Sequence, residues 1–152
     1  MPSSMVLKGI GSSAPAEAVF LGGYNATGKQ ISNGTPVCWS AIASDGKSAV
    51  LATSTTFLNY GLFAGIVTST VGTADYTGAI QAYGVATART WSNTTNHIPG
   101  CGLILVGGKD YLVYGTEGQV GVNGGAVRLM VTALETNSSG GTASAKVFVK
   151  AM

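Results

Sequence analysis

The chain has 152 residues, of which 45% are hydrophobic and only 9% are charged, and its formal net charge is +2. A chain of this length is expected to form one domain with a buried core, and its Lys and Arg residues are scattered rather than clustered beside aromatics, so we expect no nucleic acid partner. The sequence has no apolar window long enough to cross a membrane, and residues 1–8 lack the pattern of a secretory signal, so we expect neither a signal peptide nor a membrane partner.

The low content of charged residues bears on the surface of the protein. In an ordinary soluble domain about a quarter of the residues are charged, whereas this surface must be covered largely by Ser, Thr, Asn and Gly. A monomer with so few charges is at risk of self-association. We therefore expect part of the surface to be buried against another protein.

The first stretch of the chain, residues 1–18, lacks a regular hydrophobic period and is expected to form an extended N-terminal arm. Residues 19–152 are expected to form a single β-domain. Its first strand is predicted at 19–21 and is expected to end at Gly22-Gly23, with a loop over 24–34.

A first hairpin is predicted around Asp45-Gly46, because Asp-Gly between two apolar runs tolerates the positive φ angles of a tight turn. Its arms would be residues 37–43 and 48–52.

A second, central hairpin is predicted from the apolar runs 60–67 and 78–88, which are separated by a stretch rich in Ser, Thr and Gly. The second run consists mainly of Ala and Gly, with Ile80, Tyr83 and Val85 as its large apolar members. Small side chains on a β-surface allow another sheet or another chain to approach closely. We therefore interpret this run as the centre of the fold and as a packing surface.

The polar segment that follows, residues 90–100, is predicted to be a surface loop that ends in the Pro99-Gly100 turn. It carries Trp91, and an exposed tryptophan is a candidate contact residue.

Four further strands are predicted toward the C-terminus. The run 102–106 is expected to pair with 111–114, and the run 126–135 shows β-type alternation. In that run we expect inward side chains at Val127, Leu129, Val131 and Ala133, and outward ones at Arg128 and Thr132. In the last strand, 143–151, we expect one face to hold Ala145, Val147, Val149 and Ala151 and the other to hold Lys146 and Lys150, with Phe148 as an apolar group between the two lysines.

Together these patterns predict an all-β protein, a compact barrel or sandwich of about seven to nine short antiparallel strands with an extended N-terminal arm.

Enzymatic chemistry is not indicated. The single histidine, His97, lies in the polar loop, and there is no Gly-x-Ser-x-Gly elbow. The carboxylates lie mostly in or beside turns, and the segment 107–110 lacks the spacing of a phosphate-binding loop. We expect no catalytic residue and no cofactor.

The two cysteines, Cys38 and Cys101, are too few for a structural zinc site, so we expect no metal. We interpret them as two mostly buried thiols, with a disulfide as the alternative.

The central segment resembles a known family. Phe63-Ala64-Gly65-Ile66-Val67 is followed, after a polar stretch, by Gly78-Ala79-Ile80-Gln81-Ala82-Tyr83-Gly84-Val85-Ala86. Over residues 60–115 this phrase is similar to the head decoration (cement) proteins of tailed bacteriophages. The chain departs from that family in its long Trp91 loop and its low acidic content.

The resemblance implies a structural virion protein that is made in the host cytoplasm and located on the capsid exterior. It would form a homotrimer, bind the major capsid protein of an icosahedral phage head and stabilise contacts between capsid subunits. The arm residues expected to contact the capsid are Val6, Leu7 and Lys8. The residues expected to form oligomer contacts are Ile80, Ala82, Tyr83, Val85 and Trp91.

Two other functions fit the sequence. The protein could be a carbohydrate-binding or receptor-binding β-module of a phage tail fibre, or a self-assembling coat or tail-tube subunit. A stacking platform for sugars would draw on Trp39, Trp91, Tyr24, Tyr60, Tyr76, Tyr83, Tyr111 and Tyr114.

Overall fold

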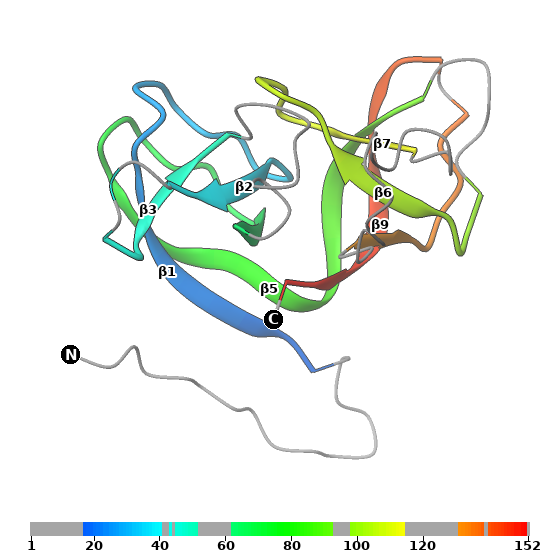
Figure 1. The fold of residues 1–152 in the computed structure, drawn as a ribbon. Helices are drawn as coiled ribbons and strands as arrows, with labels where there is room; N and C mark the ends of the chain where they lie inside the picture. Colours follow the sequence, from blue (N-terminus) through cyan, green and yellow to red (C-terminus); the bar gives the residue numbers. More distant parts are fainter. Residues whose placement is uncertain are drawn as a thin grey trace, which may run out of the picture.

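The computed structural model describes residues 17–40, 43, 45–51, 62–92, 98–114, 131–138 and 140–151. These residues form nine β-strands and no helix, so the all-β prediction is confirmed (Figure 1). The strands are β1 (Val19–Asn25), β2 (Pro36–Trp39), β3 (Ser48–Val50), β4 (Phe63–Val67), β5 (Tyr76–Trp91), β6 (Gly102–Leu105), β7 (Leu112–Tyr114), β8 (Val131–Ala133) and β9 (Thr142–Lys150). In this part of the chain no helix could span a membrane. Of the predicted arm, only residues 17 and 18 are described.

The strands form two closed rings that share β5. The first ring runs β1-β3-β2-β4-β5 and closes because β1 also pairs with β5. The second ring runs β5-β7-β6-β8-β9 and closes because β9 also pairs with β5. In Figure 1 the long green ribbon of β5 passes from the first ring, on the left, to the second ring, on the right. The 16 residues of β5 make it long enough to serve both rings.

Most pairings are antiparallel, as predicted, but β1–β3 and β5–β7 are parallel. The partners in a parallel pair need a long crossover connection. Here the connections contain β2 and β6, which belong to the same rings. The apolar runs and turns of the sequence indicate hairpins between consecutive strands, so they do not predict these parallel pairs.

The Asp-Gly hairpin is confirmed. Strands β2 and β3 pair antiparallel with Trp39 opposite Ala49, and Gly46 has a φ of 65°. The Asp45 carboxylate fixes the turn, because it accepts hydrogen bonds from the backbone N–H of Lys47 at 3.0 Å and of Ser48 at 2.8 Å. The Ser48 hydroxyl donates a further bond to it at 2.6 Å.

The central hairpin is also confirmed, with Val67 of β4 opposite Ile80 of β5. So is the pairing of β6 with β7, in which Ile104 lies opposite Val113.

Two predicted strand ends were wrong. Strand β1 does not stop at Gly22-Gly23 but continues to Asn25, and a Cβ at Gly23 would lie 2.6 Å from Cδ1 of Ile80. This glycine therefore permits close packing inside a strand and does not end it. Strand β5 likewise continues to Trp91 instead of ending before a loop at residue 90, because β9 and β7 pair with its last residues.

In the C-terminal strands, Val131 and Ala133 are buried as predicted, whereas residues 126–130 lie outside the described part of the chain. In β9, Ala145, Val147 and Val149 are buried and the two lysines are exposed, so its predicted alternation is confirmed.

Each ring has its own hydrophobic core. The core of the first ring contains Ile31, Val37, Ala49, Ala64, Val67, Val71 and Ile80. The core of the second ring contains Ala86, Ala88, Leu103, Leu105, Leu112, Val131, Ala133, Val147 and Val149, together with Cys38, Phe63 and Ile66 from β2 and β4. One face of β2 and β4 therefore packs into the core of the first ring, and the other face packs into the core of the second ring.

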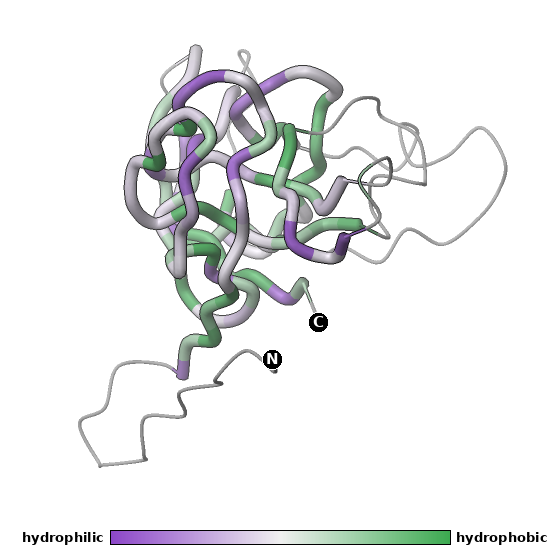
Figure 2. The backbone as a smooth tube through the Cα atoms, turned by 90° about the vertical axis from the view of Figure 1, so that its left-hand side faces the viewer, coloured by the Kyte–Doolittle hydropathy of each residue, from purple (hydrophilic) through white to green (hydrophobic). Residues whose placement is uncertain are grey.

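In Figure 2 the apolar start of β1 is the green segment that leaves the lower edge of the molecule.

A bulge explains how β4 serves both cores. Val37 lies opposite Gly65, but the next residue, Cys38, lies opposite Phe63. The extra residue shifts the alternation, so Phe63 and Ile66 face the second ring while Ala64 and Val67 face the first.

Candidate functional site

The longest exposed surface with a defined register is the outer face of β5 and β9. The two strands pair without interruption from Tyr83 opposite Lys150 to Trp91 opposite Thr142. Because side chains alternate across a strand, every second residue points away from the core of the second ring. We use the name outer face for the following residues: Tyr83, Val85, Thr87, Arg89 and Trp91 of β5, and Thr142, Ser144, Lys146, Phe148 and Lys150 of β9.

One end of the outer face is apolar. Val85 lies directly opposite Phe148 and keeps 40% of its surface exposed. The rings of Tyr83 and Phe148 meet edge to face with their centroids 5.3 Å apart, an arrangement that aromatic pairs favour. The three side chains form one apolar patch beside Lys150.

The other end is aromatic. Trp91 keeps 36% of its surface exposed and stacks on Tyr111, with centroids 6.4 Å apart and ring planes at 25°. Tyr111 comes immediately before β7, and β7 pairs in parallel with the end of β5. The sequence named both Trp91 and Tyr111 as candidates for a stacking platform but did not predict that they pair, because their contact depends on that parallel pairing.

The middle of the outer face holds paired charges. Arg89 forms a hydrogen-bonded ion pair with Asp110. Lys146 forms an ion pair with Glu135 at 3.3 Å, and its backbone N–H donates to the same carboxylate at 2.9 Å. That backbone hydrogen bond, together with the lysine side chain, holds the pKa of Glu135 below its usual value.

The structure divides the predicted oligomer contacts. Tyr83, Val85 and Trp91 lie on the outer face, so their role stays a prediction. Ile80 and Ala82 are fully buried, which corrects the expectation that they contact another subunit. The arm residues Val6, Leu7 and Lys8 lie outside the described part of the chain.

Close approach to the small-residue strand does occur, but within the same chain. Gly84 has a φ of 97°, and its Cα lies against the carbonyl of Glu17 and the Cα of Ala18, where a Cβ would overlap the backbone. Moreover, Tyr83 pairs with Val19 of β1 and with Lys150 of β9. The edges of β5 are therefore occupied by the strands of its own two rings.

The aromatic residues do not form a continuous platform. The described pairs are Tyr24–Tyr76, Tyr83–Phe148 and Trp91–Tyr111. The last two pairs are separated by eight residues of β5, a distance of roughly 25 Å. Trp39 packs against the core of the first ring, and the side chains of Tyr60 and Tyr114 lie outside the described part.

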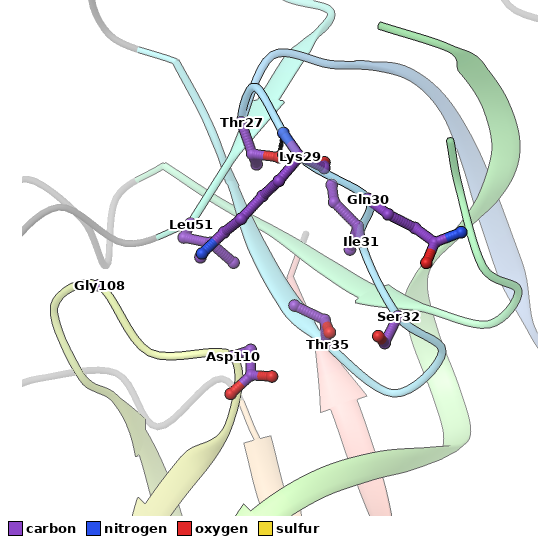
Figure 3. Close-up of a pocket in the computed structure, with 9 residues that line it drawn as sticks. All are labelled: Thr27, Lys29, Gln30, Ile31, Ser32, Thr35, Leu51, Gly108 and Asp110. Carbon is purple, nitrogen blue, oxygen red and sulfur yellow. Dashed lines mark hydrogen bonds between the residues drawn. The ribbon is translucent and has the colours of Figure 1, made fainter. Parts of the chain in front are cut away.

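A second feature is a cleft of about 280 Å³ where the two rings meet, which we call the seam cleft (Figure 3). One wall comes from the segments after β1 and β3, and the other from the turn between β6 and β7. Its lining residues are Thr27, Lys29, Gln30, Ile31, Ser32, Thr35, Leu51, Gly108 and Asp110. No sequence motif indicated this cleft, since its two walls come from segments that lie far apart in the chain.

The cysteines and the histidine were the residues considered for disulfide, metal or catalytic chemistry. Cys38 is buried in the core of the second ring, and burial raises the pKa of its thiol to about 12. Cys38 and Cys101 do not form a disulfide with each other. Among the described residues no group of three or more His, Cys, Asp and Glu side chains could hold a metal ion, and His97 lies outside them.

Comparison of the chain with protein-family models, with curated protein sequences and with solved structures finds no match.

Proposed function

We propose that the protein is a capsid decoration (cement) protein, a structural virion protein that forms a homotrimer and binds the major capsid protein on the exterior of an icosahedral phage head. The observation that carries the proposal is the apolar patch of Tyr83, Val85 and Phe148 on the regular outer face. Val85 is exposed, and Tyr83 and Phe148 are half-buried. An apolar patch of this kind, in a chain with few charges, is typical of a surface that contacts another protein.

The charge arrangement of the outer face suits repeated contacts between copies. Arg89 and Lys146 are each paired with a carboxylate, so the middle of the face carries little net charge. Like charges that meet across an interface are unfavourable. A face with paired charges can therefore be repeated around a shell without strong repulsion.

A trimer uses its contacts head to tail, because each subunit of a three-fold ring places one surface against a different surface of the next. In the proposed assembly the apolar patch would contact the neighbouring subunit. The Trp91–Tyr111 stack, at the far end of the outer face, would contact the capsid. Many such weak contacts on a repetitive shell add up to stable attachment.

The experiment compares the wild-type protein with Val85→Lys by size-exclusion chromatography with light scattering, followed by co-sedimentation with undecorated phage heads. The wild type is expected to be a trimer that sediments with the heads, and the variant a monomer. Thr73→Lys is the matched control, because it adds the same charge at an exposed turn away from the outer face. A wild-type monomer that does not bind heads would overturn the proposal.

A second candidate, a glycan-binding module of a tail fibre, is favoured by one observation, the exposed Trp91 stacked on Tyr111. Sugars stack on exposed aromatic rings of this kind. Titration of oligosaccharides into wild type and Trp91→Ala separates the candidates, because only the glycan module requires saturable binding that the variant loses. A self-assembling coat or tube subunit would instead give open polymers in the light-scattering measurement.

A further inference from the structure

We propose that the seam cleft binds a small organic anion, a compact molecule with a carboxylate or phosphate group, through the Lys29 ammonium and the Thr35 hydroxyl. The proposal does not depend on the capsid role. It rests on an unsatisfied buried group, on the charges around it and on the way the cleft is held together.

The unsatisfied group is the hydroxyl of Thr35. This residue lines the cleft and is only 1% exposed, and its Oγ1 has no hydrogen-bond partner in the described part of the chain. Its backbone groups are both satisfied, since its N–H donates to Ser32 at 3.2 Å and its carbonyl accepts from Val67 at 3.0 Å. A buried hydroxyl without a partner is unfavourable. A ligand oxygen that accepts from Oγ1 would remove that penalty.

The charges around the cleft favour an anion. The carboxylate of Asp110 is already paired with Arg89. Lys29 has no carboxylate partner among the described residues, and its side chain extends across the cleft in Figure 3. The three groups together leave one positive charge, on the Lys29 ammonium. A carboxylate or phosphate placed between Lys29 and Thr35 would receive both a charge interaction and a hydrogen bond.

The loop that carries Lys29 is held in place before any ligand arrives. The Asn25 side chain donates to the carbonyl of Lys29 at 2.8 Å and to that of Gly72 at 2.8 Å. The Thr27 hydroxyl donates to the same Lys29 carbonyl at 2.7 Å. A loop fixed in this way loses little conformational freedom on binding.

The remaining lining residues define the body of the ligand. Ile31 and Leu51 contribute apolar surface, and Ser32 contributes a second hydroxyl. The volume of about 280 Å³ lies just below the range of roughly 300–1,000 Å³ for sites of drug-sized ligands. The cleft therefore suits a short organic acid or a small phosphate ester better than an extended chain.

The test uses the full chain, with inorganic phosphate and malonate as the two probes, at constant ionic strength adjusted with sodium chloride. Binding is followed by isothermal titration calorimetry and by amide chemical shifts in two-dimensional NMR. We expect saturable binding of at least one probe with Kd below about 10 mM, and the largest shifts at the amides of Ser32, Thr35 and Gly108. Which probe binds distinguishes a phosphate from a carboxylate ligand.

Three variants make the test specific. Thr35→Val preserves the shape but removes the hydroxyl, and it should weaken binding about tenfold or more without lowering the melting temperature. Lys29→Gln should abolish saturable binding. Lys109→Gln is the matched control, since it removes the same charge beside the cleft from a residue that does not line it, and it should bind as the wild type does. The proposal is overturned if neither probe saturates, or if folded Thr35→Val and Lys29→Gln both bind as tightly as Lys109→Gln.

Discussion

Gly65 of β4 lies so close to the carbonyl oxygen of Gln81 in β5 that a Cβ at Gly65 would overlap it. Gly65 also has a φ of 140°, a backbone conformation that residues with a Cβ rarely adopt. It lies at the bulge that turns Phe63 and Ile66 toward one core and Ala64 and Val67 toward the other. This close contact therefore connects the bulge of β4 to the strand that both rings share.

The first prediction concerns Gly65→Ala. The added methyl group would force β4 away from β5 and strain the backbone, so we expect a loss of at least about 2 kcal/mol in the free energy of unfolding. Urea unfolding followed by circular dichroism measures it. Gly78→Ala is the control, because a Cβ at this exposed β5 position meets no atom within 4 Å. Equal stability of the two variants would contradict the close approach.

The second prediction concerns Ile66→Ala. Ile66 is fully buried and reaches from a strand of the first ring into the core of the second, so truncation should cost about 2–5 kcal/mol. Because this residue connects the rings, both should unfold together in the wild type and in the variant. Trp39 reports on the first ring and Trp91 on the second, and single-tryptophan variants measured by fluorescence should give coincident unfolding curves. Leu134→Ala, at an exposed position, should change stability by less than about 0.5 kcal/mol. Separate midpoints for the two tryptophans would contradict this prediction.

The third prediction concerns the loss of stability at low pH. Hydrogen bonds from the Ser48 hydroxyl and from the backbone N–H groups of Lys47 and Ser48 lower the pKa of Asp45 to about 2, whereas an unfolded aspartate titrates near about 3.9. A carboxyl whose pKa is depressed by folding adds stability above the unfolded value and loses it as the pH falls toward the folded value. We therefore expect the contribution of Asp45 to be fully present above about pH 5 and to disappear between about pH 4 and pH 2.

Urea unfolding measured at a series of pH values checks this prediction. Asp45→Asn should flatten the acid-dependent loss of stability in that window. Ser48→Ala removes the hydroxyl that contributes most to the lowered pKa of Asp45. This variant should therefore raise the pKa of Asp45 and narrow the pH range over which stability is lost. An unchanged acid profile in both variants would show that the turn does not act in this way. Glu135, whose pKa is also lowered, contributes in the same direction and remains in every variant.

The fourth prediction concerns Asn25→Ala. The buried Asn25 side chain satisfies the carbonyls of Lys29 and Gly72 and accepts from the N–H of Thr27 at 3.0 Å. Removing it takes away these three hydrogen bonds from a buried position, so we expect a loss of about 1–3 kcal/mol in stability and weaker binding of anions in the seam cleft. Asn33→Ala, at an exposed turn, is the control. Thermal unfolding and the phosphate or malonate titration measure the two effects, and a stable variant with unchanged affinity would contradict the role of Asn25.

The sequence predicted those parts of the fold that depend on neighbouring residues. The Asp45-Gly46 turn and the central hairpin follow from turn chemistry and from apolar runs, and both are confirmed. The closure of two rings on β5 could not be predicted in the same way. It depends on pairings such as Tyr83 with both Val19 and Lys150, and residues so far apart in the chain carry no local signal of their contact.

The same reason explains the errors at individual residues. Small side chains on β5 correctly indicated close packing, but the sequence alone did not show that the partner is the same chain. As a result, the buried Ile80 and Ala82 were predicted to contact another subunit. The seam cleft was missed because Lys29, Thr35 and Asp110 are brought together only when the two rings meet.

The sharing of β5 between the rings also sets an order of assembly during synthesis on the ribosome. All five strands of the first ring have been made once Trp91 is added, so that ring can close while the rest of the chain is still being translated. The second ring cannot close until β9 is made, because β9 completes it along β5. Until then, one edge of the second half of β5 lacks its longest partner, and the nascent chain is open to pairing with other polypeptides at that edge.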